Sequence, residues 1–142
     1  MIRTGLRSGF TLVEILIVVV ILGILAAIVV PGIAGATEDT AISATTTELE
    51  KLRRAVDVYK ASNNNAVPPV TAGDGTWDVI VSRAYLKEAP VNPYVGGANA
   101  GVIVIAEGPD EAYQTEYGWI FSSTTGDVWA GGFDADDEPL PR

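Results

Sequence analysis

Residues 9–30 of this chain read GFTLVEILIVVVILGILAAIVV, and this stretch decides the fold. No charged residue occurs from Ile15 to Thr37. A helix from Phe10 to Val30 would be roughly 31 Å long, about the thickness of the hydrocarbon core of a bilayer. A helix that is apolar on all sides cannot face water. The stretch therefore predicts either a membrane span or a secretory signal that is removed.

Charge divides the 142 residues into two parts. Of the 9 basic and 18 acidic residues, only Arg3, Arg7 and Glu14 lie in residues 1–37, and the other 7 basic and 17 acidic residues give residues 38–142 a net charge of -10. Basic residues thus precede the apolar run. The positive-inside rule then places the N-terminus in the cytoplasm and the acidic remainder outside.

Glu14 lies just inside the start of the apolar run. An acidic residue in a membrane helix costs on the order of 2.5–3.5 kcal/mol at the bilayer centre and less near its edge, and such a residue usually has a partner. The plain alternative is that the carboxylate snorkels to the cytoplasmic headgroups. The neighbouring residues favour a functional role, because they form the ordered motif Gly9-Phe10-Thr11-Leu12-Val13-Glu14.

A short basic leader that ends in glycine, followed by Phe-Thr-Leu-x-Glu and roughly twenty apolar residues, resembles the N-terminal signal of type IV prepilins and of type II secretion pseudopilins. The resemblance is most specific over residues 1–60. It implies that a prepilin peptidase cuts between Gly9 and Phe10 and methylates the new amino group of Phe10. It also implies that Glu14 pairs with this amino group of a neighbouring subunit. The reference pKa of an α-amino group is about 7.7–8.0, so the amine is largely cationic at neutral pH.

Gly23 lies within the apolar run and Pro31 directly follows it, so the two residues bracket a short segment. Proline lacks a backbone donor and clashes with the preceding helical turn, and glycine is a weak helix former. The resemblance to pilins implies that this segment loosens when filaments pack. The alternative is that both residues are merely tolerated, as glycine and proline often are in membrane helices.

An ordinary secretory signal is the other interpretation of the N-terminal region. Arg3 and Arg7 would form its basic part, and Ala34-Gly35-Ala36 would offer a small-residue cleavage site. However, the apolar run exceeds the usual length of about 7–15 residues, and Glu14 hinders partitioning into the membrane. A secreted soluble protein therefore remains the alternative to a membrane-anchored one.

Helical spacing continues beyond the apolar run, so we expect one helix over residues 10–62, ended by three asparagines and two prolines. Its apolar side after the run carries Ile42, Leu49, Leu52, Val56 and Tyr59. Its charged side is expected to face solvent and carries Glu48, Glu50, Lys51, Arg53, Arg54 and Lys60.

A lone amphipathic helix needs a partner for its apolar side, and the remaining residues predict a small sheet. Strands are expected over residues 101–107, 116–122 and 128–130, with a short helix over residues 76–83. Thr124-Thr125-Gly126-Asp127 signals a tight turn. The predicted fold is α+β, a long N-terminal helix packed on a small antiparallel sheet, as in pilins.

The C-terminal residues carry four carboxylates on a short loop: Asp134, Asp136, Asp137 and Glu138. Calcium takes 6–8 oxygen ligands. The resemblance implies a calcium site here, because major pseudopilins bind calcium in a C-terminal loop. The alternative is a solvated acidic tail. No other cofactor is expected.

Several classes of function are excluded by composition and by missing motifs. The chain has no cysteine and no histidine, which excludes disulfides, cysteine nucleophiles and the commonest general base. No Gly-rich phosphate loop or nucleophile elbow occurs, so we expect no enzymatic activity. A head with a net charge of -10 repels phosphate, so we expect no nucleic-acid binding.

The sequence therefore predicts a structural subunit of a type IV pilus-like or type II secretion pseudopilus filament. Residues 1–9 would be the leader, residues 10–36 the transmembrane and filament-core segment, and residues 37–142 the extracytoplasmic head. The expected partners are other copies of the chain, the prepilin peptidase, an inner-membrane assembly platform and, before assembly, membrane lipid. The chain would cross the inner membrane once and then join a periplasmic or cell-surface filament. A minor subunit at the filament tip is the alternative, which Glu14 and the small head disfavour.

Overall fold

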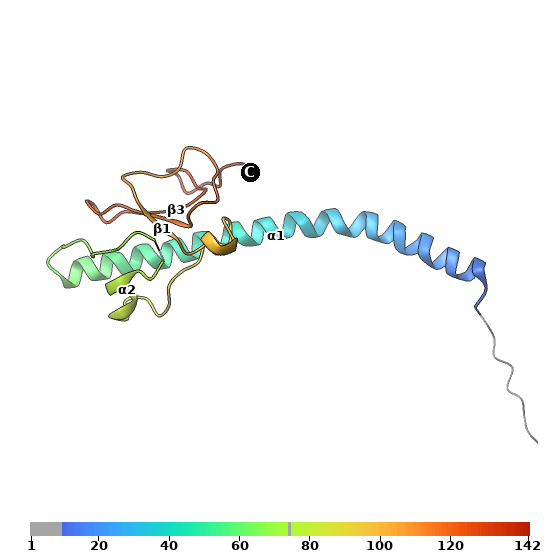
Figure 1. Ribbon diagram of the computed structural model, residues 1–142, viewed down its shortest axis with the longest axis horizontal. Helices are drawn as coiled ribbons and strands as arrows, with labels where there is room; N and C mark the ends of the chain where they lie inside the picture. The colour runs from blue at the N-terminus through green and yellow to red at the C-terminus, as the bar shows by residue number, and fades with distance from the viewer. Residues whose placement is uncertain (1–9, 74) are drawn as a thin grey trace, which may run out of the picture. The chain divides into compact units, whose positions relative to one another are not determined.

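A computed structural model describes residues 10–73 and 75–142 of the chain, apart from the side chains of residues 28–36, and is drawn in Figure 1. The helices are α1 (Leu12–Ser62), α2 (Asp78–Ser82) and the 3-10 helix η1 (Gly97–Asn99). The strands are β1 (Ile103–Ile105), β2 (Trp119–Phe121) and β3 (Val128–Ala130). A long N-terminal helix with a small three-stranded sheet confirms the predicted α+β class.

The chain divides into two compact units, Met1–Thr37 and Glu38–Arg142, and α1 contributes residues to both. In the view of Figure 1, the strands lie along one side of the cyan and green part of α1, and α2 lies on the other side. The unit Glu38–Arg142 contains the whole sheet and is called the head below.

The end of α1 is set by asparagines in the left-handed conformation. Asn64 and Asn65 have φ angles of 54° and 61°. Asparagine is among the few residues that tolerate this conformation. The backbone N–H of Asn65 donates to the carbonyl of Lys60 at 2.8 Å, which satisfies one of the last carbonyls of the helix. The predicted end of the helix at residue 62 is therefore confirmed.

The core of the head forms between α1 and the sheet. Leu49, Leu52 and Val56 recur at helical spacing, and each is at most 1% exposed. They belong to one cluster with Trp119 and Phe121 of β2. Burial of a side chain of this size stabilises a fold by about 1.5–3 kcal/mol. The apolar side predicted for the second half of α1 therefore packs on the sheet.

The sheet has the order β1-β2-β3 and is mixed. β2 and β3 are antiparallel, with Trp119 opposite Ala130, but β1 and β2 are parallel, with Ile103 opposite Trp119. The expectation of an entirely antiparallel sheet is therefore wrong for one strand pair. The reason is the length of the connections: parallel strands need a crossover of about a dozen residues or more. Residues 106–118 provide it between β1 and β2, whereas a tight turn joins β2 to β3.

Asn92 connects α1 to the ends of two strands and is fully buried. Its Oδ1 accepts hydrogen bonds from the Thr45 hydroxyl at 3.0 Å and from the backbone N–H of Tyr94 at 2.9 Å. Its Nδ2 donates to the carbonyls of Gly118 and Gly131, both at 2.9 Å. A buried amide is tolerated when its donors and acceptor are paired. The side chain therefore fixes the helix against the start of β2 and the end of β3.

Candidate functional site

The amino end of α1 begins with a side-chain cap. The hydroxyl of Thr11 accepts a hydrogen bond from the backbone N–H of Glu14 at 3.2 Å. The carbonyl of Thr11 accepts from the N–H groups of Glu14 and Ile15 at 3.1 and 3.3 Å. Thr11 is therefore the N-cap residue, and Glu14 stands at the third helical position, as in the capping-box pattern Thr-x-x-Glu. Our sequence reasoning missed this cap, although the spacing of the pattern could have revealed it.

Large apolar side chains cover the first part of α1 on all sides. No other part of the same chain, within the described residues, covers them, so they are exposed. The exposed fraction is 76% for Phe10 and 83% for Leu12, and it stays above 45% along the rest of the segment. The other residues of this apolar surface are Val13, Ile15, Leu16, Ile17, Val18, Val19, Val20, Ile21, Leu22, Ile24 and Leu25. So large an apolar surface marks an interaction site for lipid or for other helices.

The apolar surface carries a shallow groove near its amino end. The groove has a volume of about 400 Å³ and is lined by Leu12, Ile15, Leu16 and Val19. These residues recur at the spacing that places them on one face of a helix. This is the geometry that lets side chains of a second helix insert between them.

Glu14 is exposed and is not among the residues that line this groove. Among the described residues, its carboxylate has no hydrogen-bond or ion-pair partner, and the hydrogen bonds of this residue are made by its backbone N–H group. An unpaired carboxylate within an apolar surface is costly once that surface leaves water. The predicted pairing of Glu14 with an amino group of another subunit stays a prediction, as does snorkelling.

The other residues predicted in this segment are placed as follows. Gly9 lies outside the described residues, and Phe10 is the first residue within them. A Cβ atom added at Gly23 would meet nothing within 4 Å, so packing inside the chain does not require glycine there. Pro31 lies within α1, and its side chain is not among those described. The predicted cleavage, methylation and helix loosening stay predictions.

Among the residues that the structure describes, no helix combines the length and the apolarity needed to cross a membrane. The membrane span expected over residues 10–36 stays a prediction.

The acidic tail is held by the chain itself. Oδ1 of Asp134 accepts hydrogen bonds from the backbone N–H groups of Asp136 and Glu138 at 2.9 and 3.0 Å. Both carboxylate oxygens of Asp137 accept from the Arg53 guanidinium, Oδ2 from Nη1 at 2.5 Å and Oδ1 from Nη2 at 2.9 Å. No group of three or more acidic side chains within the described residues is arranged to hold a metal ion. The expected calcium site stays a prediction.

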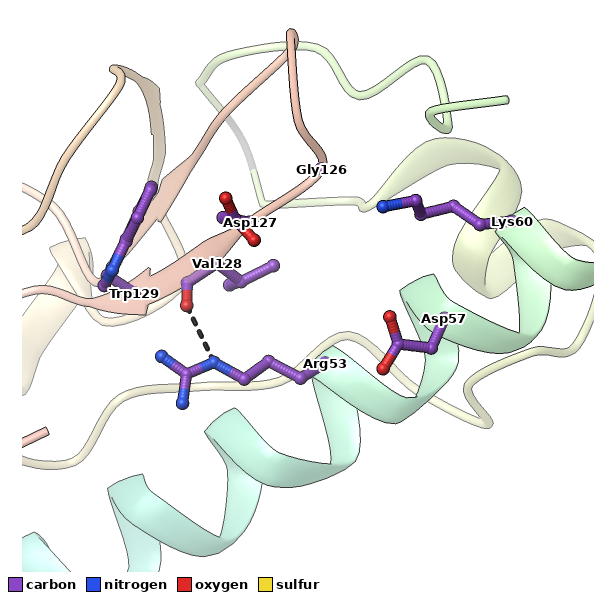
Figure 2. Close-up of a pocket in the computed structure, with 7 residues that line it drawn as sticks. All are labelled: Arg53, Asp57, Lys60, Gly126, Asp127, Val128 and Trp129. Carbon is purple, nitrogen blue, oxygen red and sulfur yellow. Dashed lines mark hydrogen bonds between the residues drawn. The ribbon is translucent and has the colours of Figure 1, made fainter. Parts of the chain in front are cut away.

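Figure 2 shows a pocket between α1 and β3, with a volume of about 210 Å³. Arg53 Nε donates to the carbonyl of Val128 at 2.9 Å, and Lys60 Nζ donates to the carbonyl of Thr125 at 2.9 Å. The expectation that these two side chains only face solvent is therefore wrong, because each satisfies a carbonyl at β3 or at the turn before it. Since both cations are already bonded, this pocket is a structural contact of the head. Its lining residues are Arg53, Asp57, Lys60, Gly126, Asp127, Val128 and Trp129.

Comparisons with known proteins agree with the features of the N-terminal segment. The family model described as Prokaryotic N-terminal methylation motif matches residues 6–30. The type II secretion system core protein G of Pseudomonas aeruginosa is 35% identical over 101 residues, which cover 62% of this chain and 68% of that protein. No solved structure matches the chain significantly.

Two further relatives carry the same name, type II secretion system core protein G. The protein of Dickeya chrysanthemi is 41% identical over 130 residues, covering 78% of this chain and 82% of that protein. The protein of Escherichia coli is 28% identical over 135 residues, covering 80% of this chain and 89% of that protein. These matches extend well beyond the N-terminal motif into the head, and the chain belongs to the family of the type II secretion system core protein G.

Proposed function

We propose that this chain is the structural subunit of a type II secretion pseudopilus, a filament built from many copies of it. The observation that carries the proposal is the apolar surface that begins at Phe10, just before α1, and continues along α1 to Leu25 with its large side chains exposed. Copies of this helix bury that surface against one another in the filament. Exposure of one such side chain to water costs about 1.5–3 kcal/mol, so a subunit that leaves the membrane stays in the filament because the bundle keeps this surface out of water.

The N-terminal motif supports a defined maturation. A prepilin peptidase cuts between Gly9 and Phe10, and the new amino group of Phe10 is methylated. The matched methylation motif over residues 6–30 supports this step. A cut at this position retains the apolar segment, whereas a cut after Ala36 would discard it.

Glu14 selects the position of each new subunit. A buried charge without a partner is strongly unfavourable, while a buried pair with good geometry is tolerated. The cationic amino group of a neighbouring Phe10 provides that partner. Wrong positions of the helix along the bundle leave both charges unpaired, so the pair sets the register of the subunits.

The location follows from the same features. The mature subunit is held in the inner membrane by residues 10–36, with its acidic head outside the cytoplasm, until the assembly platform transfers it to a periplasmic filament. The two basic residues before the apolar run support this orientation. The role is structural, and the relatives named core protein G support it.

The test is the substitution Glu14→Ala in cells that contain the complete secretion machinery. The variant is expected in the membrane fraction at the wild-type level, but filaments seen by electron microscopy should fall at least about tenfold, since the register pair is worth more than 1.4 kcal/mol. Glu50→Ala is the matched control, because Glu50 is an exposed glutamate of the same helix. Normal filaments from Glu14→Ala would exclude the pairing, and a wild-type chain that never enters a filament would exclude the proposed function.

Mass spectrometry of the mature protein distinguishes cleavage by a prepilin peptidase from removal of an ordinary secretory signal. The expected N-terminus is an N-methylated Phe10. An N-terminus at Thr37 would establish an ordinary secretory signal and a soluble protein instead.

A further inference from the structure

Arg53 joins three parts of the head through one side chain. Its Nε donates to the carbonyl of Val128 in β3 at 2.9 Å, as Figure 2 shows. Its Nη1 and Nη2 donate to the two carboxylate oxygens of Asp137 at 2.5 and 2.9 Å. The guanidinium thus connects α1, the edge strand and the C-terminal tail, which lie far apart in the sequence.

This ion pair differs from an ordinary surface pair. Its side chains are 36% and 30% exposed, whereas those of the neighbouring pair of Arg54 and Glu50 are 71% and 62% exposed. A bidentate guanidinium–carboxylate contact is both stronger and more directional than a single contact. An exposed pair such as Arg54–Glu50 contributes little.

The tail itself forms a closed turn around Asp134. Asp134 Oδ1 accepts from the N–H groups of Asp136 and Glu138, and the N–H of Asp134 donates to the carbonyl of Glu138 at 3.0 Å. An isolated bridge pairs Phe133 with Pro139 on either side of the turn. One oxygen of Asp134 is therefore already used by the backbone of its own turn.

The donor set of the tail does not fit a calcium ion in this arrangement. Calcium takes 6–8 oxygen ligands, yet both oxygens of Asp137 face a guanidinium and one oxygen of Asp134 faces two amides. Asp136 and Glu138 are exposed. The negative charge that a metal ion would neutralise is already paired at Asp137.

We propose that the guanidinium of Arg53 takes the place of a divalent cation in this tail. It neutralises Asp137, fixes the tail to α1 and β3, and makes the folding of residues 132–140 independent of calcium. The backbone of Asp137 has a φ angle of 61°, a conformation that aspartate tolerates better than most residues. The bidentate pair holds this residue where the turn requires it.

The experiment measures amide hydrogen exchange of residues 132–140 in the detergent-solubilised full chain. The wild-type protein should show the same protection, and the same thermal midpoint, in millimolar calcium chloride and in EDTA. Asp137→Asn and Arg53→Lys should each raise exchange in residues 132–140 by about tenfold or more, because they remove the bidentate charged contact. Calcium should not restore the protection.

Two matched controls separate this effect from that of the same side-chain changes at neighbouring positions. Arg54→Lys changes the next arginine of the same helix, and Asp136→Asn changes an exposed carboxylate of the same tail. Both should leave the exchange unchanged. Asparagine at position 137 keeps the shape of the side chain and tolerates a positive φ angle, so that variant is expected to fold.

Either of two results would overturn the inference. Loss of tail protection in EDTA that calcium restores would show that a metal ion holds the tail. Wild-type protection in Asp137→Asn and Arg53→Lys would show that the pair is not what fixes it. The measurement is made before assembly, so it is independent of whether the chain forms filaments.

Discussion

The hydroxyl of Thr45 donates a hydrogen bond of 3.0 Å to Oδ1 of Asn92, and both residues are fully buried. The two residues lie 47 positions apart in the sequence. The carbonyl oxygen of Ala41 lies 2.8 Å from the same hydroxyl oxygen and shares its single proton with Asn92. This hydrogen bond joins α1 to the loop before the sheet. Asn92 also bonds to the residues beside β2 and β3, so one buried side chain connects the helix to the sheet.

Asn92→Asp should destabilise the head strongly. The new carboxylate oxygen would face the carbonyls of Gly118 and Gly131 in place of the amide donor. Because an unsatisfied buried polar group costs about 1–3 kcal/mol, we expect the free energy of unfolding to fall by at least about 2 kcal/mol. Denaturant unfolding in detergent, followed by tryptophan fluorescence, measures this change.

Asn99→Asp is the control for the same chemical change. Asn99 is exposed, and its side chain donates to the carbonyl of Thr115 at 2.8 Å. Loss of this hydrogen bond should lower the free energy of unfolding by less than about 1 kcal/mol, because water replaces the lost donor at the exposed carbonyl. Equal effects of the two substitutions would show that the buried contacts of Asn92 do not stabilise the head.

The sequence was sufficient to predict the long helix, the short helix α2 and the three strands, but not the 3-10 helix η1. The helix expected over residues 10–62 is α1, and the strand expected over residues 128–130 coincides with β3. Both follow from local signals, since periodicity sets the helix and a tight turn precedes the strand. The pairing of β1 with β2 is different, because it depends on the path of residues 106–118, which no local pattern specifies.

The contacts of polar side chains were the least predictable part. Asn92 lies between two prolines, and no local pattern marks it as buried, while in the structure it is a buried residue with several hydrogen bonds. Arg53 belongs to a charged helix side, and its partners Val128 and Asp137 lie 75 and 84 positions away. Such contacts depend on tertiary packing. The cap at Thr11 is the exception, because its partner Glu14 lies three positions away.

Gly118→Ala should disrupt the start of β2. A Cβ atom at this position would lie 2.1 Å from the carbonyl oxygen of Ala100, so the backbone must move. Overpacking of this kind costs about 1–3 kcal/mol. Gly108→Ala in the same crossover is the control, since its Cβ would meet nothing within 4 Å. Denaturant midpoints should fall for Gly118→Ala and stay near the wild-type value for Gly108→Ala. A tolerated alanine at position 118 would contradict the close approach of these two chain segments.

The hydroxyl of Tyr117 makes the stability of the head sensitive to alkaline pH. It donates to Asp110 Oδ1 at 2.6 Å. Burial, followed by this hydrogen bond, raises the pKa of Tyr117 from 10.0 to about 12. The unfolded chain therefore loses this proton at lower pH than the folded head. The free energy of unfolding should then decrease as the pH rises from 10 towards 12.

Tyr117→Phe isolates this contribution, because it retains the ring and removes the ionisable group. Thermal midpoints measured from about pH 9 to about pH 11.5 should fall less steeply for the variant than for the wild type. Burial also raises the pKa of Tyr94, so a shallower decline is expected to persist in the variant. Identical slopes in the two proteins would show that Tyr117 loses its proton equally easily in the folded and unfolded chains.

Thr11→Val tests the cap at the amino end of α1. Valine has a similar shape but cannot accept the hydrogen bond from the N–H of Glu14. Loss of an N-cap costs about 0.5–2 kcal/mol, so amide exchange in the first turn should become about two- to thirtyfold faster. Thr11→Ser keeps the hydroxyl and should behave like the wild type.

Because the same turn carries Glu14, a frayed helix would also leave that carboxylate poorly positioned for a neighbouring subunit. Thr11→Val should then form fewer filaments than Thr11→Ser when the two variants reach equal levels in the membrane. Equal filament yields would show that assembly does not depend on the cap.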